Sequence, residues 1–441
     1  MVKKMWFCLS MIIVGSLEAA DYECKNEFND DELLNETITK RLREAGIDAN
    51  LCFCGSLDFS AMFINQTEKK DKDGAVASLQ GDINLKYLQK YDGYGFGCEI
   101  GAKTRSGVVK SGQAVLDSSF LFMESDQIGS VKLGYTNTAA DKFSICGDKV
   151  LVGYQGAGSG NLHCFYNASS GSIVGAGFVF DDDKAAKISW LSPIISGFSV
   201  GLSFTPDSRD ANLFKTEHDE EIHDLCGKEN FANSSAYSKN IITGGIAYEW
   251  GAPDGLNAKF SVGGWFGKGK PGCRNSGSIA VRNVHAYNVG ALLGYKDFKV
   301  SLGYTDNGKS LLSTKYAGQE TTAFDPHRAY VISDPDVGIK EDADSGKIYS
   351  IGAAYAFDKL IVSAGYFRSE VKFSGNEKAK ADIITLATQY EFSKVLSLYL
   401  EYDNINTSTC DRAMAYAVAC EQSVVGKNRA NAVILGIKFN F

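Results

Sequence analysis

The sequence is dominated by an alternation of apolar and polar residues that begins near Leu51 and continues to the last residue, Phe441. In the first segment, Leu57, Phe59 and Phe63 fall on one face of an extended chain, and small or polar residues fall on the other. Each segment has about ten residues, the length that a tilted β-strand needs to cross a bilayer. Sixteen segments show this pattern: 56–63, 78–87, 94–104, 113–123, 128–136, 184–192, 198–205, 240–250, 256–267, 285–295, 298–305, 347–357, 360–367, 382–392, 396–403 and 431–441.

The connections between these segments alternate between short turns, such as 296–297, and loops that reach about forty residues. Even strand numbers and this alternation of connections are typical of outer-membrane β-barrels, whose closure leaves no backbone group unpaired in lipid. A soluble β-sandwich also alternates, but nearly four hundred residues of evenly spaced strands would be very large for one sandwich. The pattern therefore predicts an all-β fold, a transmembrane antiparallel β-barrel of about 16 strands over residues 51–441.

Prolines and aromatic residues are distributed as such a barrel requires. All six prolines fall in predicted turns or loops, where a missing N–H breaks no ladder hydrogen bond. Aromatic residues gather at segment ends: Trp250 and Phe392 flank short turns, whereas Phe63 and Tyr366 flank long loops. These rings predict the two interfacial girdles of a membrane barrel.

Residues 1–20 are predicted to be a secretory signal peptide, because Lys3 and Lys4 precede an apolar run that is too short to span a bilayer. No later stretch is long and apolar enough to predict a membrane-spanning helix. The net charge of −8 argues against a nucleic-acid partner, since nucleic-acid binders carry basic patches. We therefore expect the chain to be exported.

Residues 21–50 depart from the alternation, and part of them predicts a short amphipathic helix. In "NDDELLNETITKRLREAG", residues 29–46, Asn29 is a candidate N-cap, an apolar residue recurs every fourth position from Leu34 to Leu42, and Gly46 is a stop signal. We interpret this helix as a periplasmic extension that caps or tethers the barrel. A partial plug inside the lumen and a protein-docking helix remain alternatives.

Three stretches resemble a known family. "GSVKLGYT" (129–136), "KISWLSPIISGFSVGLSFTPD" (187–207) and the closing strand that ends in Phe441 resemble the Gram-negative porins, particularly the alphaproteobacterial type. The resemblance implies a bacterial outer-membrane location with both termini in the periplasm, contact with outer-membrane lipid, and a homotrimer. It also implies that Phe441 is an assembly signal read by the barrel assembly machinery. The last strand should pair with the first, near residues 57–64.

By the same resemblance, residues 137–183 correspond to the porin loop that folds inward and narrows the channel. The segment is rich in glycine, which suits irregular packing against a wall. The predicted constriction residues are Lys86, Lys103, Lys132, Asp141, Asp148 and Lys187. The alternative is an ordinary wetted wall, because a water-filled lumen favours polar residues at every inward position.

Ten of the eleven cysteines follow the signal peptide, an even number that fits an oxidising compartment. The candidate disulfides are Cys146 with Cys164, Cys410 with Cys420, and Cys226 with Cys273. The first two pairs would close short loops, which restricts chain that is otherwise free to move. Connectivity itself does not follow from sequence.

No catalytic constellation is evident. The stretch "EHDEEIHDLC", residues 217–226, mixes His218, His223 and Cys226 with acidic residues but matches no standard zinc spacing. A solvated acidic loop explains it better than a metal site. We therefore expect no enzyme, no metal and no cofactor.

The sequence predicts a porin through which small hydrophilic solutes and ions diffuse passively. Two other functions stay open: a surface adhesion or binding protein that displays long external loops on a barrel, and a solute-specific channel. The alternation also predicts that Leu386 faces lipid and Thr385 faces the lumen. An arginine should then be tolerated at Thr385 but not at Leu386.

Overall fold

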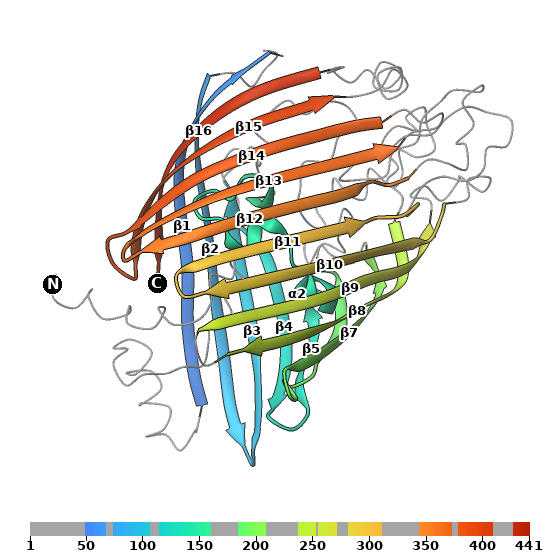
Figure 1. Cartoon of the computed structure of the whole chain (residues 1–441). Helices are drawn as coiled ribbons and strands as arrows, with labels where there is room; N and C mark the ends of the chain where they lie inside the picture. The colour runs from blue at the N-terminus through green and yellow to red at the C-terminus, as the bar shows by residue number, and fades with distance from the viewer. Residues whose placement is uncertain are drawn as a thin grey trace, which may run out of the picture.

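The computed structural model describes residues 49–67, 74–105, 114–159, 184–208, 237–252, 255–270, 281–310, 344–372, 378–408 and 427–441. Sixteen strands form one closed antiparallel barrel, in which each strand pairs with its neighbours in sequence and β1 pairs with β16 (Figure 1). The predicted fold class and strand number are confirmed. The strands are β1 Ala49–Gln66, β2 Gly74–Tyr91, β3 Tyr94–Arg105, β4 Ala114–Ser125, β5 Gly129–Tyr135, β6 Ala186–Leu191, β7 Phe198–Asp207, β8 Tyr237–Gly251, β9 Leu256–Lys270, β10 Val284–Tyr295, β11 Phe298–Asp306, β12 Lys347–Phe357, β13 Leu360–Lys372, β14 Lys378–Glu391, β15 Leu396–Ser408 and β16 Lys427–Asn440.

The barrel closes by pairing of the last strand with the first, as predicted. Leu57 lies opposite Phe439 in the register of β1 and β16. At the end of the chain, the backbone N–H of Phe441 donates to the carbonyl of Gly55 at 2.9 Å, and the N–H of Gly55 donates back at 2.8 Å. A Cβ on Gly55 would lie 2.8 Å from Cζ of Phe441, so glycine makes room for the terminal ring. Phe441 is therefore a hydrogen-bonded member of the seam.

Alternate residues along each strand face outward and inward. On β16, Val433, Leu435 and Ile437 are 41–46% exposed, whereas Ala432 and Ile434, each directly before one of them, are buried. Exposed apolar residues continue around the other strands with the same period of two. This outer face is the apolar band of a membrane barrel.

The two ends of the barrel differ in their connections. Short turns such as Asp92–Gly93, whose φ angles of 48° and 79° match a type I′ hairpin, join strands at one end. The carboxyl terminus lies at this end, since the N–H of Asn440 donates to the carbonyl of Val395 in the β14–β15 turn. The strand ends that the longer connections join lie at the opposite end.

Helices are few among the described residues: α2 Ala139–Phe143 and the 3₁₀ turns η2 Gly147–Val150 and η3 Gly156–Ser159. None of these described helices is long or apolar enough to cross a membrane. The predicted signal peptide and almost all of the predicted 21–50 extension lie outside the described residues. Residues 49 and 50 belong to β1, so the barrel begins two residues earlier than predicted.

Leu386, in the middle of β14, tests the assignment of the outer face. Its side chain is 51% exposed, so Leu386→Arg places a charge in the apolar band and should lower the free energy of unfolding by about 2–4 kcal/mol. The measurement is a urea titration of the protein folded into lipid vesicles. Asn84→Arg, which faces the interior from β2, is the control and should have little effect. Equal losses in both variants would contradict the assignment.

Candidate functional site

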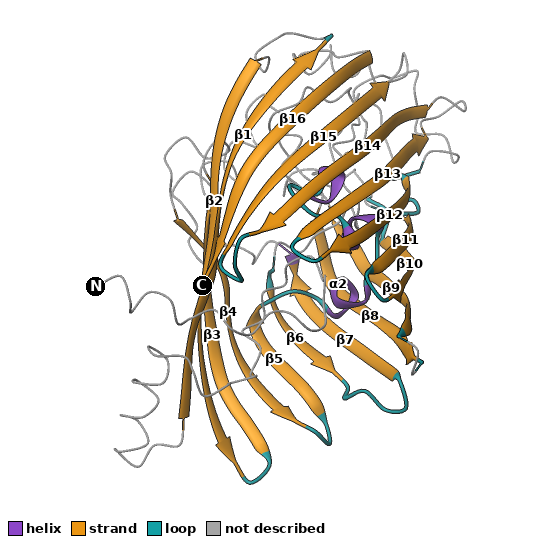
Figure 2. Cartoon of the chain, turned by 60° about the vertical axis from the view of Figure 1, so that its left-hand side comes forward, coloured by secondary structure: helices purple, strands orange, loops and turns teal. Residues whose placement is uncertain are grey.

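The connection between β5 and β6 turns into the barrel after Tyr135. Its described part, residues 137–159, is here called the inward segment. Figure 2 shows α2 and the two 3₁₀ turns inside the ring of strands. Proceeding along the segment, α2 packs on β7, β8 and β9, η2 packs on β11, β12 and β13, and η3 reaches β14. The segment therefore lines about half of the inner wall.

The inner wall supplies hydrogen-bond acceptors to the backbone of the inward segment. These acceptors are side chains of successive strands, and each satisfies an N–H that irregular chain would otherwise bury unpaired. The bonds are Ala139 N–H to Ser203 Oγ at 2.7 Å, Ile145 N–H to Asn288 Oδ1 at 3.1 Å, Gly147 N–H to Ser350 Oγ at 2.9 Å, and Val152 N–H to Ser363 Oγ at 3.1 Å.

Glycines allow the segment to approach the wall this closely. From β7 to β13, each strand has an inward glycine at which a Cβ would lie within 2.0–3.1 Å of an atom of the segment. At Gly352, for example, the Cβ would lie 2.0 Å from the carbonyl oxygen of Gly147. We call this set the glycine row; its members are Gly201, Gly245, Gly263, Gly290, Gly303, Gly352 and Gly365.

The segment begins with a capped helix. The hydroxyl of Thr138 accepts the N–H of Asp141 at 3.2 Å, and the carboxylate of Asp141 accepts the N–H of Thr138 at 3.0 Å. This reciprocal pair is a capping box. Lys187 on β6 donates to the carbonyl of Thr136 and is only 3% exposed. Asp141 and Lys187, both predicted at the constriction, thus hold the start of the segment.

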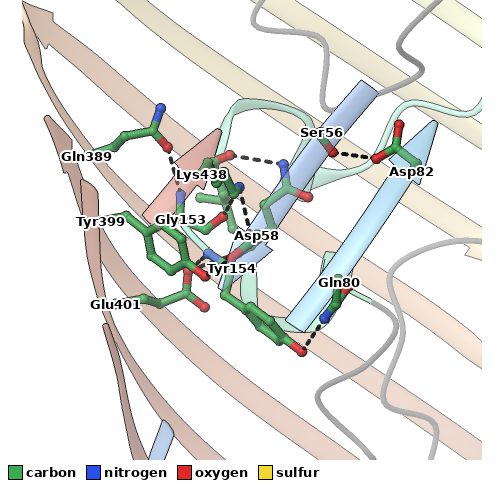
Figure 3. A network of polar contacts seen from close by, with 12 residues as sticks. Ser56, Asp58, Gln80, Asp82, Gly153, Tyr154, Gln389, Tyr399, Glu401 and Lys438 are labelled. Carbon is green, nitrogen blue, oxygen red and sulfur yellow. Dashed lines mark hydrogen bonds and ion pairs between the residues drawn. The ribbon is translucent and has the colours of Figure 1, made fainter. Parts of the chain in front are cut away.

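The far end of the segment is held by Glu401 on β15. Its carboxylate accepts the backbone N–H groups of Tyr154, Gln155 and Gly156 at 2.7, 2.8 and 2.9 Å (Figure 3). Each such hydrogen bond contributes about 0.5–1.5 kcal/mol, or about 1.5–3 kcal/mol where the acceptor is charged. Lys438 on β16 also donates to the carbonyl of Gly153. These contacts of Glu401 and Lys438 with residues 153–156 are called the latch.

The latch is itself supported by neighbouring strands (Figure 3). The hydroxyl of Tyr399 donates to Asp58 on β1 at 2.8 Å, and Lys438 lies 3.9 Å from the same carboxylate. Gln80 on β2 donates to the hydroxyl of Tyr154 at 3.0 Å. Residues from β1, β2, β15 and β16 therefore meet at the tip of the segment and bridge the barrel seam.

The remaining predicted lysines lie on strands that α2, η2 and η3 do not cover. Lys86 on β2 and Lys132 on β5 lie over the rings of Phe122 and Phe120, at 4.8 and 4.9 Å. Lys103 on β3 pairs with Asp117 at 3.0 Å, and Lys184 contacts the same carboxylate. The lysines of β2, β3 and β5 thus lie away from α2, η2 and η3, and of these three strands β2 also contacts the tip of the segment through Gln80.

Asp148 lies between the segment and the wall. It lines a small cavity with Ser350, Gly365 and Thr385, and within the described residues its buried Oδ1 has no hydrogen-bond partner. Burial raises the pKa of the Asp148 carboxyl. The structure therefore places Asp148 between the segment and the inner wall.

The predicted disulfide between Cys146 and Cys164 is wrong, because Cys146, the one of the two cysteines that the structure describes, is not disulfide-bonded. Cys146 is a free, buried thiol whose sulfur accepts from Nδ2 of Asn288 at 3.5 Å. Its side chain is packed among buried wall residues, and burial together with nearby Asp148 raises the pKa of the thiol to about 12. The partner positions Cys164, Cys226, Cys273, Cys410 and Cys420 lie outside the described residues.

The tolerance predicted for arginine at Thr385 does not fit the structure either. Thr385 faces inward as predicted, but its side chain is 2% exposed and its hydroxyl donates to Asp403 at 2.6 Å. Gly156 of the segment lies directly over it. Because the segment fills the space beside β14, an arginine has no water-filled lumen to enter at this position.

Sequence reasoning missed the residues that hold the segment: Glu401, Lys438, Gln80 and the glycine row. A usable signal existed for the glycines, since seven strands in succession place one on the inward face. The signal for Glu401 was weaker, because a glutamate on the inward face of a strand is also expected where the wall simply contacts water.

The Gram-negative porin family matches residues 45–409 of the chain. The chain belongs to the Gram-negative porin family. It is 24% identical over 367 residues to an uncharacterized protein of Rickettsia bellii, covering 74% of this chain and 76% of that protein. It is also 25% identical over 422 residues to an uncharacterized protein of Rickettsia conorii, covering 81% and 86%.

Solved porins share the fold. OmpT of Vibrio cholerae in its trimer form aligns with a TM-score of 0.54 and 12% identity, over 89% of this chain and 99% of that one. The anion-selective porin from Comamonas acidovorans gives 0.54 and 15%, over 89% and 100%. Family and fold together support an outer-membrane location and favour a channel over an enzyme. Among the described residues no three His, Cys, Asp or Glu side chains are grouped to bind a metal.

We predict that Glu401→Ala frees the tip of the segment, because the change removes the acceptor of three backbone N–H groups, two of them buried. Amide hydrogen exchange of residues 154–156 should accelerate by roughly tenfold or more, whereas α2 amides should stay protected. Gln389→Leu, which removes a 3.4 Å contact to Gly153 and leaves all three hydrogen bonds of Glu401 in place, is the control. Unchanged exchange at 154–156 in Glu401→Ala would refute the latch.

The burial of Asp148 predicts that its contribution to the stability of the folded protein depends on pH. Because burial raises its folded-state pKa above the ordinary 3.8, Asp148 favours the fold below that value, and the benefit is lost as the pH rises through the raised pKa. Asp148→Asn should therefore raise the thermal unfolding temperature at alkaline pH and change it little in acid. Circular dichroism in detergent measures both, with Asp126→Asn in an exposed turn as the control. A stabilisation that is equal at both pH values would contradict this placement of Asp148.

Proposed function

We propose that this protein is a diffusion porin, a water-filled channel through which small hydrophilic solutes and ions cross the outer membrane passively. The observation that carries the proposal is the inward segment, which is fixed along half of the inner wall and faces the lysine-bearing strands β2, β3 and β5. A segment held in this way narrows the barrel without closing it. The path for solutes then runs between the segment and those lysines.

The arrangement in the membrane follows from the same proposal. The chain is exported through a signal peptide at residues 1–20, and the short-turn end with both termini faces the periplasm. Residues 21–50 form a helical periplasmic extension, and Phe441 is the signal for the barrel assembly machinery; its place in the seam supports this by fixing the terminal carboxylate beside β1. We also propose a homotrimer, as in the trimer form of the Vibrio cholerae porin.

Electrical recording tests the channel directly. Purified protein added to a planar bilayer should give stepwise increases in conductance. Uptake of sugars, phosphates and amino acids into liposomes then separates the candidate functions. A diffusion porin passes solutes by size, a solute-specific channel passes few of them, and an adhesion protein passes none. Absence of conductance steps from folded protein would refute the proposal.

We predict that the charge of Lys132 influences which ions pass through the proposed channel. Its ammonium lies on the inner face of β5 over the Phe120 ring, and a fixed charge beside a narrow aqueous path biases ion permeation. Lys132→Glu should shift the reversal potential toward cations, changing the permeability ratio by roughly twofold or more.

Lys359→Glu is the matched control, because Lys359 lies in the exposed β12–β13 turn. Salt screens charges beyond about 8–10 Å, so this change should have a smaller effect. Equal shifts in the two variants would show that Lys132 does not line the narrow part of the path.

A further inference from the structure

Two phenylalanines of β4 face the interior of the barrel, where a water-filled channel favours polar side chains. Phe120 and Phe122 are each 6% exposed, whereas Leu121 between them is 60% exposed on the outer face. The two ring centroids lie 6.3 Å apart with an interplanar angle of 58°, and Leu88 on β2 completes a small buried cluster. A wall that merely contacts water gives no reason for this cluster.

The neighbouring strand fixes the place of the Phe122 ring. Gly97 on β3 is the register partner of Phe122, and a Cβ on Gly97 would lie 2.5 Å from Cζ of that ring. The missing side chain therefore lets the ring lie across β3 toward β2, where it joins Leu88 in the buried cluster. A ring held in this way presents its face at a defined position on the inner wall.

Lys86 on β2 lies over this ring although a carboxylate is opposite it on β3. The ammonium nitrogen of Lys86 is 4.8 Å from the centroid of the Phe122 ring. In the register of β2 and β3, Lys86 is directly opposite Glu99, which faces inward as well. Within the described part of the chain, however, Lys86 makes no ion pair with Glu99 or with another carboxylate. The ring therefore holds the ammonium in preference to the opposite carboxylate.

A lysine over a ring and a lysine in an ion pair contribute differently to the potential inside the barrel. Lys103 on β3 pairs with Asp117 at 3.0 Å, so a negative charge offsets its positive charge. A phenylalanine ring attracts a cation through its quadrupole but has no net charge. Lys86 thus keeps its positive charge beside the lumen, at a place that its flexible four-carbon stem alone would not fix.

We propose that Phe122 is a positioning residue for ion selectivity, because its ring holds the Lys86 ammonium beside the lumen and away from Glu99. Phe120 and Lys132 repeat the arrangement on β4 and β5, with 4.9 Å between ring centroid and ammonium nitrogen. The inference rests on the proposed channel, since selectivity exists only where ions pass. Without the attraction of the ring, the ammonium swings to the opposite carboxylate, and the potential along the path becomes less positive.

Fluorination of Phe122 tests the ring while its shape changes little. In the full-length protein, replacement of Phe122 by para-fluorophenylalanine and then by trifluorophenylalanine withdraws electron density from the ring face and weakens its attraction for a cation stepwise. Reversal potentials in a salt gradient should shift stepwise toward cations, and the anion-to-cation permeability ratio should fall by roughly 1.5-fold for the trifluorinated ring. In Lys86→Gln, the same replacements should have no effect, because the ammonium is absent.

Phe96 provides the matched control. It lies on β3 with its ring 44% exposed on the outer face, so trifluorination at this position should leave the reversal potential unchanged. A purely structural role for the Phe122 ring depends neither on its electrons nor on Lys86. Equal shifts from fluorination at Phe122 and Phe96, no shift at either, or an undiminished shift in Lys86→Gln would therefore overturn the proposal.

A second measurement does not depend on ion flow. In nuclear magnetic resonance spectra of the detergent-solubilised protein with isotope-labelled lysine, the ring current of Phe122 should move the ε-methylene protons of Lys86 upfield, and Phe122→Leu should return them to the ordinary lysine position. Conductance steps without this ring-current shift would overturn the positioning role alone. The shift without conductance steps would overturn the channel, and the selectivity role with it.

Discussion

The whole structure depends on one constraint: backbone N–H and C=O groups cannot remain unpaired away from water. In the wall, this constraint requires that β16 return to β1, and the pairing extends to Phe441, whose N–H and carbonyl both bond to Gly55. Inside the barrel the same constraint acts on an irregular segment. Residues 139–156 have few hydrogen bonds among themselves, so the wall supplies acceptors such as Ser203, Ser350 and Glu401.

The inward segment and the wall therefore have matched chemistry. The glycine row removes side chains where the backbone of the segment must come close, and hydroxyls and carboxylates stand where its N–H groups need partners. The cost is that several groups are buried. Asp148 keeps an unpaired oxygen among the described residues, and Cys146 is packed as a thiol that ionises only at high pH. Such a match gives the segment one position along the wall, which a passage of defined width requires.

Periodicity in the sequence was sufficient to predict the wall, because a lipid face and an inner face impose a period of two on every strand. It predicted sixteen strands, the seam with Phe441 and the inward direction of Thr385. It failed where side chains contact the inward segment. The alternation shows whether a side chain faces inward or outward, but it does not show which residues that side chain contacts. Thr385 and Asp148 point inward or lie on the segment as expected, yet both are covered. Cys146 shares its stretch of sequence with Cys164, but its thiol faces Asn288 on β10.

The central claim is that the inward segment sets the width of the passage, and the size cut-off for neutral polymers in the open channel tests it most directly. Residues 139–158 can be replaced by a short glycine-serine linker, because no strand of the barrel includes them. Polyethylene glycols of graded size, added during planar-bilayer recording, then report the width from the largest polymer that enters. The account predicts that the shortened variant folds, conducts more, and admits larger polymers than the unaltered protein. An identical cut-off in two well-folded channels would contradict it.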